Sequence, residues 1–541
     1  MHGTDGVTGP VSRTDRRRFL AGISGTAALL AFPGCRIGPE SHPALTLGES
    51  LRLLETGTLT SRELVRRALG RIAALDRSGP ALHAVIAVDP DAEAEARRQD
   101  DRRRAGTAAP LAGIPVLIKD NIDTAGRLPT TAGSLALSDF PAAADAPLVA
   151  RLRAAGAVVL GKANLSEWAN FRSSRSVSGW SAVGGQTRNP HALARTPWGS
   201  SSGSAAAVAA GYCAVAVGTE TNGSIIAPAS ACGVVGLKPT VGLVSRTGIV
   251  PIAGSQDTAG PMARTVLDAA RLLGAMAGSD PEDPATDEAD RRSRDGFLRF
   301  LRPDALRGRR IGIARDFFGD HPEADRLVES HFGLLRELGA ELVDPVRIPD
   351  HDRIHEGNFT VMLHEFRTGL AAYLARRGDT VRVRSLAEVI AFNEAHAGRE
   401  LAVFDQDTFL RAERTPPLSA GEHRRLRDLC RERAREKGLL AALEAHRLDA
   451  LVAPSCAPAT HIDPVNRDRY IGGCTSLPAI GGTPHLTVPA GTVGGLPVGI
   501  SFLGAPWTEA ELLGFGHAFE IAAKARSEPR FPADVPFPSG A

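Results

Sequence analysis

The chain has 541 residues and a formal net charge of +2 at pH 7, with 43% hydrophobic, 23% charged and 5% aromatic residues. This composition is typical of globular proteins and excludes wholesale disorder. The balanced charge leaves no broad basic surface for nucleic acid or an acidic membrane, and the few aromatic residues argue against a base-stacking platform. We therefore expect a folded protein with no nucleic-acid partner.

Lysine is scarce in this chain. Of 63 basic residues, five are lysines: Lys119, Lys162, Lys238, Lys437 and Lys524. Arginine stays protonated in proteins, whereas a buried lysine can lose its proton. A lysine that is kept against this bias is therefore a candidate for a role that arginine cannot fill.

Residues 1–35 have the pattern of an export signal. The pair Arg16-Arg17 is followed by Phe19, Leu20 and a short apolar stretch that ends near Cys35. A basic segment before a brief apolar one is typical of export signals, and the arginine pair resembles the twin-arginine type. The apolar run is shorter than the ~20 residues of a membrane span. We expect a periplasmic, cell-envelope or extracellular protein, with a membrane contact only if Cys35 is lipidated.

Strand and helix patterns alternate along the rest of the chain. Two amphipathic helices are predicted over 44–80, and an apolar strand over 113–118 ends at Lys119. Further helices are predicted over 146–156, 204–210, 322–338 and 508–526, and a long helical, charged region over 362–447. Further strands are predicted over 157–160, 212–217, 310–314, 450–453 and 498–502. This alternation predicts an α/β fold, with a sheet covered by helices on both faces, in a single domain over about 40–541.

Neither a disulfide framework nor a zinc site is predicted. The five cysteines after Cys35 are widely spaced and form no CxxC pair. His351 and His355 have a spacing that metal ligands sometimes use, but two solvated histidines on a polar helix explain it more simply. We expect no metal and no organic cofactor.

The segment 196–240 is rich in glycine and serine. A linker does not explain it, because an alanine-rich helix and an apolar strand follow at once. A phosphate-binding loop would need GxxxxGK[ST], which is absent. Residues 199–203 fit the G-x-S-x-G nucleophile elbow, with Ser201 as the nucleophile. That motif needs a strand directly before it, and the preceding residues contain two prolines and no apolar run.

Several long motifs in a fixed order resemble the amidase signature family. They are Gly113-Ile114-Pro115-Val116 with Lys119-Asp120, then residues 199–204 (GSSSGS), 218–224 (GTETNGS), 232–240 (CGVVGLKPT), 255–262 (SQDTAGPM), 453–455 (APS) and 496–499 (LPVG). The resemblance spans nearly all of the chain after residue 40. It implies a large mixed β-sheet between helices and the hydrolysis of carboxamide C–N bonds to a carboxylic acid and ammonia or an amine.

The resemblance also implies a catalytic set. Carried onto this chain, Ser224 is the nucleophile, Ser200 is a bridging serine that follows a cis peptide, and Lys119 is the base. A serine hydroxyl is a weak nucleophile until a base removes its proton, and a lysine can be that base only if its pKa is lowered toward neutrality. Ser-Lys arrangements are a known variant of the catalytic triad.

Residues around this set have predicted supporting roles. The backbone N–H groups of Thr221, Asn222, Gly223 and Ser224 would form an oxyanion hole, and one such donor is worth about 10²–10³ in rate. Ser201 and Ser202 would support the site through hydrogen bonds. Lys238 also matches the family, and we interpret it as structural.

Three departures from the common family pattern favour the bacterial peptide amidase branch, which removes the C-terminal amide of peptides. Glu220, Asn222 and Ile226 stand where many members have Asp, Gly and Arg. The substrate would be a small-molecule or peptide amide, with water. One alternative is the A subunit of a tRNA-dependent amidotransferase complex, which the export signal disfavours. The other is a non-catalytic binding protein on the same scaffold. No feature of the sequence defines an oligomeric state.

Overall fold

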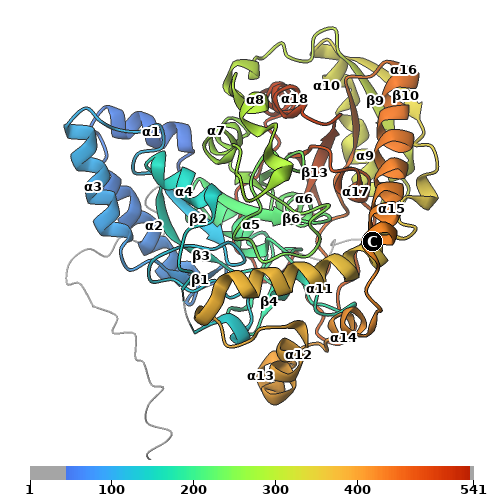
Figure 1. The fold of residues 1–541 in the computed structure, drawn as a ribbon. Helices are drawn as coiled ribbons and strands as arrows, with labels where there is room; N and C mark the ends of the chain where they lie inside the picture. The colour runs from blue at the N-terminus through green and yellow to red at the C-terminus, as the bar shows by residue number, and fades with distance from the viewer. Residues whose placement is uncertain (1–43, 140, 536–541) are drawn as a thin grey trace, which may run out of the picture. The chain divides into compact units, whose positions relative to one another are not determined.

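A computed structural model describes residues 44–139 and 141–535 of the chain (Figure 1). The predicted export signal and Cys35 lie outside the described residues. In the described part, no helix is both long enough and apolar enough to cross a membrane.

The centre of the described chain is one mixed sheet. Its eleven strands lie in the order β1-β3-β2-β6-β8-β7-β12-β13-β11-β9-β10. Pairing is parallel among β3, β2 and β6 and among β11, β9 and β10, and antiparallel elsewhere. The strands are β1 Val85–Val88, β2 Pro115–Lys119, β3 Val158–Ala163, β6 Val215–Glu220, β7 Val235–Lys238, β8 Thr258–Ala263, β9 Arg310–Ala314, β10 Glu341–Val346, β11 Ala450–Pro454, β12 His485–Val493 and β13 Leu496–Leu503; β4 Trp180–Ser181 and β5 Gly185–Gln186 form a separate hairpin.

Helices surround this sheet in Figure 1, and α11 runs along one side of it. They are α1 Leu47–Glu55, α2 Ser61–Leu75, α3 Ala92–Arg104, α4 Pro147–Ala154, α5 Ser202–Ala209, α6 Ile226–Ala231, α7 Val266–Met276, α8 Ala289–Ser293, α9 Pro322–Ser330, α10 Phe332–Glu337, α11 Asn358–Arg377, α12 Leu386–Ala395, α13 Ala397–Glu400, α14 Asp407–Arg414, α15 Ala420–Arg431, α16 Ala441–His446, α17 Ser476–Gly481 and α18 Glu509–Ala523. A π-helical turn, Glu432–Leu440, joins α15 to α16.

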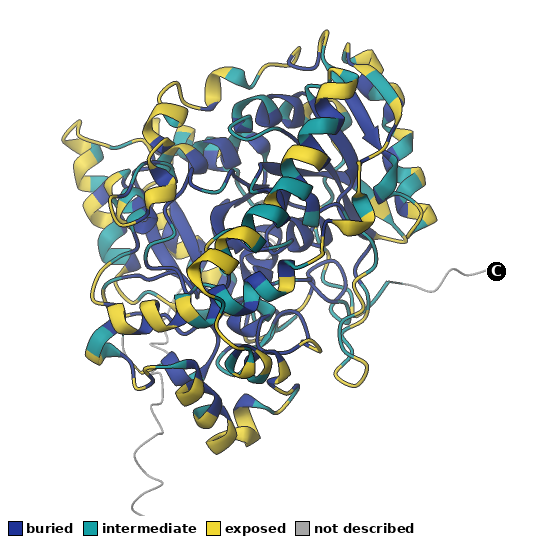
Figure 2. Cartoon of the chain, turned by 45° about the vertical axis from the view of Figure 1, so that its right-hand side comes forward, coloured by how far each residue is buried: buried dark blue, intermediate teal, exposed yellow. Residues whose placement is uncertain are grey.

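The central strands are buried on both faces, as the dark strands of Figure 2 show. Alternate residues of β2 belong to two different hydrophobic clusters: Val116 and Ile118 to the cluster that includes residues of α4, α7 and α18, and Leu117 to the cluster that includes residues of α2, α3, α5 and α6. This two-residue period is the geometry of a strand covered on both sides. The predicted α/β fold with helices on both faces is therefore confirmed.

One predicted helix is divided. The sequence predicts a single helix over 322–338, but α9 ends at Ser330 and α10 begins at Phe332. His331 lies at the break, where its imidazole Nε2 is 2.7 Å from the carbonyl oxygen of Ala490 in β12. This contact is with a strand some 160 residues further on, so local periodicity could not predict the break.

Two parallel neighbours determine where the site lies. β2 ends at Lys119, β6 ends at Glu220, and Ile118 is paired with Val217. Parallel strands present their carboxyl ends at the same edge of a sheet, and ligands of α/β proteins commonly bind there. The predicted base and the predicted nucleophile loop therefore meet at one edge.

Candidate active site

Lys119 is fully buried at the end of β2. Its Nζ donates hydrogen bonds to Ser200 Oγ at 2.8 Å, Thr219 Oγ1 at 2.8 Å and the Thr219 carbonyl oxygen at 3.2 Å. Burial lowers the pKa of Lys119 to about 7, although the carboxylates of Glu220 and Asp257 partly oppose this shift. A substantial fraction of this amine is therefore neutral near pH 7 and able to accept a proton.

Ser200 lies on a tightly packed turn before α5. The Gly199–Ser200 peptide bond is cis, as the family resemblance implies. A Cβ atom on Gly199 would lie 2.2 Å from Ser166 Oγ, so this position has no room for a side chain. Ser200 itself is fully buried, with its hydroxyl facing the Lys119 amine.

Ser201 and Ser202 bind backbone groups. Ser201 Oγ donates to the Thr219 carbonyl at 3.0 Å and accepts from the Thr219 N–H at 3.1 Å. Ser202 Oγ donates to the Trp198 carbonyl at 2.6 Å. No strand lies between Thr187 and Ser201, and Ser201 is fully buried. The geometry therefore lacks the strand and the exposed hydroxyl of a nucleophile elbow.

Ser224 lies in the loop between β6 and α6. Its carbonyl oxygen accepts a hydrogen bond from the Ser201 N–H at 3.1 Å, which fastens this loop to the turn that holds Ser200. The Ser224 hydroxyl forms no hydrogen bond with any described residue. Ser224 is 8% exposed and lines a cavity of about 380 Å³, so its hydroxyl is available to a ligand.

The loop before Ser224 is held by its side chains. Thr221 Oγ1 donates to the buried Asp257 carboxylate. The Asn222 amide donates to Ser476 Oγ at 3.1 Å and accepts from Thr475 Oγ1 at 3.1 Å. Gly223 has a φ of +80°, a conformation that favours glycine. Within residues 44–139 and 141–535, the N–H groups of Thr221, Asn222 and Ser224 donate no hydrogen bond, and this leaves them available to a developing oxyanion.

Glu220, one of the departures from the family pattern, stabilises the start of α6. Its carboxylate accepts the N–H groups of Ile225 at 2.7 Å and Ile226 at 3.0 Å. Lys238 is also fully buried, and the charge of Glu220 partly offsets the burial that lowers the pKa of Lys238 to about 8. The Lys238 Nζ donates to the Pro239 carbonyl at 3.1 Å. These contacts give Lys238 structural partners. Ile226, which stands where many family members have Arg, is a buried residue of α6.

The sequence did not reveal the far wall of the cavity. Residues from four separate segments complete it: Asn170, Phe171, Ser178, Ile252, Met362, Asp468 and Tyr470. No motif marks these positions, because they come together only through the folded loops around α11 and before α17.

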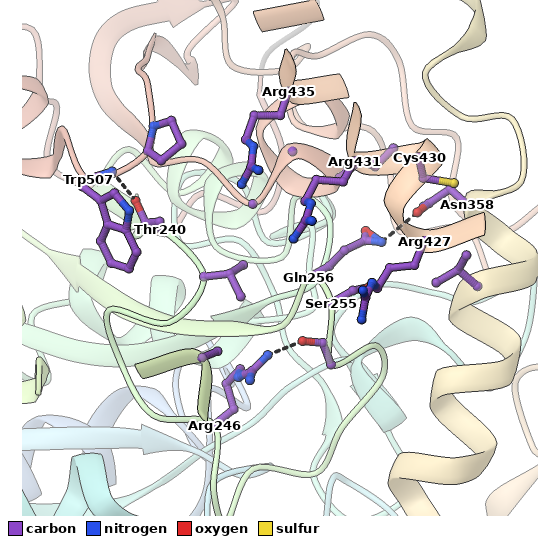
Figure 3. A pocket seen from close by; sticks show the side chains of 18 residues that line it. Thr240, Arg246, Ser255, Gln256, Asn358, Arg427, Cys430, Arg431, Arg435 and Trp507 are labelled. Atoms are coloured by element: carbon purple, nitrogen blue, oxygen red, sulfur yellow. Dashed lines mark hydrogen bonds between the residues drawn. The ribbon is translucent and has the colours of Figure 1, made fainter. Parts of the chain in front are cut away.

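A second cavity of about 410 Å³ lies apart from the predicted site residues (Figure 3). The side chains of Arg246, Arg427, Arg431 and Arg435 line it. Arg246 is paired with the buried Asp283, and the other three lie beside acidic neighbours on their own helical segment. Among the described residues, no cluster of His, Cys, Asp or Glu has the arrangement of a metal site.

The chain thus combines an α/β fold, a buried Lys119 hydrogen-bonded to Ser200, and a nearby loop that places Ser224 at a cavity. The family model described as Amidase matches residues 63–513, and the chain belongs to this family. It is an amidase, a hydrolase acting on amide bonds.

Several known proteins are similar to this chain in sequence or in structure. The native peptide amidase from Stenotrophomonas maltophilia is 49% identical, with a TM-score of 0.85 over 90% of this chain and 98% of that one. A probable amidase of Arabidopsis thaliana is 42% identical over 483 residues, which cover 87% of this chain and 89% of the relative. The A subunit of the glutamyl-tRNA(Gln) amidotransferase of Symbiobacterium thermophilum is 37% identical, covering 87% and 96% respectively. The neighbours support the peptide amidase branch.

Proposed function

We propose that this amidase forms an acyl-enzyme on Ser224, with Lys119 as the base and Ser200 as the proton relay. The observation that supports the proposal best is the contact between Lys119 Nζ and Ser200 Oγ at 2.8 Å, made by an amine whose pKa is about 7. A lysine in this state can remove a proton from a hydroxyl near neutral pH.

The first half of the reaction forms the acyl-enzyme. Neutral Lys119 accepts the Ser200 proton while Ser200 accepts the Ser224 proton, and Ser224 Oγ attacks the amide carbonyl carbon. The C=O electron pair moves to oxygen, and the N–H groups of Thr221, Asn222 and Ser224 stabilise the negative charge. The carbonyl re-forms, the C–N bond breaks, and the proton held by Lys119 passes through Ser200 to the leaving nitrogen.

Water completes the cycle. A water molecule gives a proton through the same relay and attacks the ester carbonyl carbon of the acylated Ser224. The second tetrahedral intermediate collapses, the C–O bond to Ser224 breaks, and the relay returns the proton to Ser224 Oγ. The products are a carboxylic acid and ammonia or an amine.

We further propose C-terminal peptide amides as substrates. The supporting relatives are the peptide amidase structures, one of them described as a complex with the competitive inhibitor chymostatin (48% identity, TM-score 0.87). The cavity of about 380 Å³ beside Ser224 is within the size range of small-ligand sites. An amidotransferase subunit on this scaffold would need a partner complex, and a binding protein would need neither Lys119 nor Ser224.

Ammonia release from a panel of C-terminal dipeptide amides tests this proposal. The purified protein is expected to release ammonia, and Ser224→Ala is expected to lower kcat by at least about 10³-fold. Ser78→Ala, an exposed serine outside the site, is the matched control and is expected to leave kcat unchanged. Turnover of none of these amides by folded protein would contradict the proposal. Retained turnover in Ser224→Ala would overturn the role of Ser224.

A further inference from the structure

The cavity beside Ser224 has an asymmetric set of charges. Among the described residues that line it, Asp468 is the only acidic one, and no lysine, arginine or histidine is present. The rest of the lining is neutral: polar on the side of Ser224 and apolar at Phe171, Trp198 and Met362. A substrate carboxylate would find no cation here, whereas a substrate cation would find one carboxylate.

Asp468 has no cationic partner among the described residues. One of its oxygens, Oδ2, accepts the Ser178 N–H at 2.8 Å, and its own N–H donates to the Ser176 carbonyl at 3.3 Å. No ion pair joins Asp468 to a cation in the described part of the chain, although Arg467 and Arg469 flank it in sequence. Burial raises the pKa of Asp468 to about 6. A partly buried carboxylate without a cationic partner is costly, and a bound cation would offset that cost.

The surrounding contacts hold Asp468 close to the catalytic turn. Tyr470, two residues further on, packs edge-on against Trp198 with ring centroids 5.3 Å apart. Trp198 directly precedes the cis peptide of Ser200. The Asn170 amide donates to Ser178 Oγ at 3.0 Å, so the segment that binds Asp468 is itself fixed to the cavity wall. Asp468 and Tyr470 therefore contact two other residues of the cavity wall, Ser178 and Trp198 respectively.

We propose that Asp468 determines substrate preference by pairing with an ammonium group of the amide substrate. The inference rests on the proposed function of the Ser224 site and specifies its substrates: amides that carry a positive charge and lack a free carboxylate. The ammonium group has two sources, the α-amine of an amino-acid or short peptide amide and a basic side chain. Both have the same chemistry, and the experiment separates them.

Paired substrates test this preference. Alanine amide is compared with N-acetylalanine amide for the α-ammonium, and N-acetyllysine amide with N-acetylnorleucine amide for the side chain. The native protein is expected to show a kcat/KM about tenfold higher for the cationic member of at least one pair. The pair that shows the preference identifies the source of the ammonium group.

Asp468→Asn removes the charge but keeps an oxygen that can accept the Ser178 N–H. It is expected to abolish the preference by raising KM for the cationic amide about tenfold, while kcat/KM for the neutral amides changes less than about threefold. Asp463→Asn, the same change in the same loop at a partly exposed position outside the cavity, is expected to keep the preference.

Two results would overturn this proposal while leaving the proposed function intact. One is equal kcat/KM for both members of each pair in the native protein. The other is an equal loss for cationic and neutral amides in Asp468→Asn, which would indicate a purely structural side chain. Failure of the amidase proposal would look different, because no amide of either charge would be hydrolysed.

Discussion

Three of the five lysines are fully buried, so scarcity alone did not distinguish Lys119. Their partners do distinguish it. Lys162 lies 3.4 Å from the Asp120 carboxylate and donates to the Ile122 carbonyl at 2.7 Å. Lys238 donates to a backbone carbonyl and lies near two buried carboxylates, those of Glu220 and Glu509. Of these three lysines, Lys119 is the one whose amine donates to a serine hydroxyl, that of Ser200, next to Gly199 in the cavity wall.

The pH dependence of the reaction follows from the lowered pKa of Lys119. The base must be neutral, and its neutral fraction rises as pH rises toward and through about 7. We expect kcat/KM for a neutral amide to increase about tenfold per pH unit below 6 and to level off above 8. The measurement is a kcat/KM profile from pH 5 to 9 with N-acetylalanine amide, whose charge is constant over this range.

Variants test whether the rise of kcat/KM between pH 5 and about 7 depends on the deprotonation of Lys119. Lys119→Arg keeps the charge but cannot release its proton near neutrality, so kcat is expected to fall at least about 10²-fold. The exposed Lys437→Arg is the control and should match the native profile. If Lys119→Arg were active and its kcat/KM rose with pH below about 7 as in the native protein, Lys119 would be excluded as the base.

Strands with an apolar run were predicted from the sequence, whereas some strands that contain glycine or proline were not. The predicted strand over 310–314 matches β9, and those over 113–118, 157–160 and 498–502 overlap β2, β3 and β13. β8 and β12 were missed because their sequences, TAGPMA and HLTVPAGTV, contain residues that are unfavourable in strands. Both lie inside the sheet between other strands, where tertiary pairing outweighs local preference.

The motifs that carry the proposed catalytic residues could be predicted from the sequence, but the residues that hold these motifs in place could not. Lys119, Ser200 and Ser224 fall in recognisable motifs, and the structure brings their segments together. The role of Glu220 depends on how the chain turns after β6, which no local pattern specifies. Only the folded loop shows that this carboxylate accepts the first N–H groups of α6.

Removal of the Glu220 carboxylate is expected to affect both stability and activity. Glu220→Ala leaves two buried N–H groups without an acceptor and Lys238 without its nearby negative charge, which costs about 3 kcal/mol. Because the same loop positions Ser224, kcat should fall as well. Chemical denaturation and ammonia release measure the two effects.

Two control variants separate these effects from general destabilisation. Glu220→Gln keeps an acceptor oxygen and should lose less stability than Glu220→Ala. Glu93→Ala removes a surface ion pair with Arg66 and should cost less than about 1 kcal/mol. A Glu220→Ala protein as stable and active as the native one would contradict the capping role.

Over the whole chain, the site is assembled from residues far apart in sequence. Ser224 and Asp468 line one cavity, although more than two hundred residues separate them. The central motifs and the sheet edge were predictable because the motif residues cluster at strand ends. The loop that carries Asp468 was not, because it has no regular structure and its place depends on contacts with Ser178 and Trp198.

We propose that residues 1–35 direct export and are dispensable for catalysis. All residues assigned to the site lie between Lys119 and Ser476, so a chain that begins at residue 40 should keep kcat and KM. In a bacterial host with the twin-arginine route, Arg16→Lys with Arg17→Lys should hold the protein in the cytoplasm. Fractionation and ammonia release measure both outcomes. Equal export of the double variant would contradict the twin-arginine assignment.

Covalent labelling of Ser224 tests the proposed mechanism most directly. The protein lacking residues 1–35 is treated with a serine-reactive fluorophosphonate, digested, and mapped by mass spectrometry. We expect a single labelled residue, Ser224, with labelling lost in Lys119→Ala while the fold, monitored by circular dichroism, is retained. A label on Ser201 or another serine, or full hydrolytic activity in protein that is completely labelled at Ser224, would contradict it.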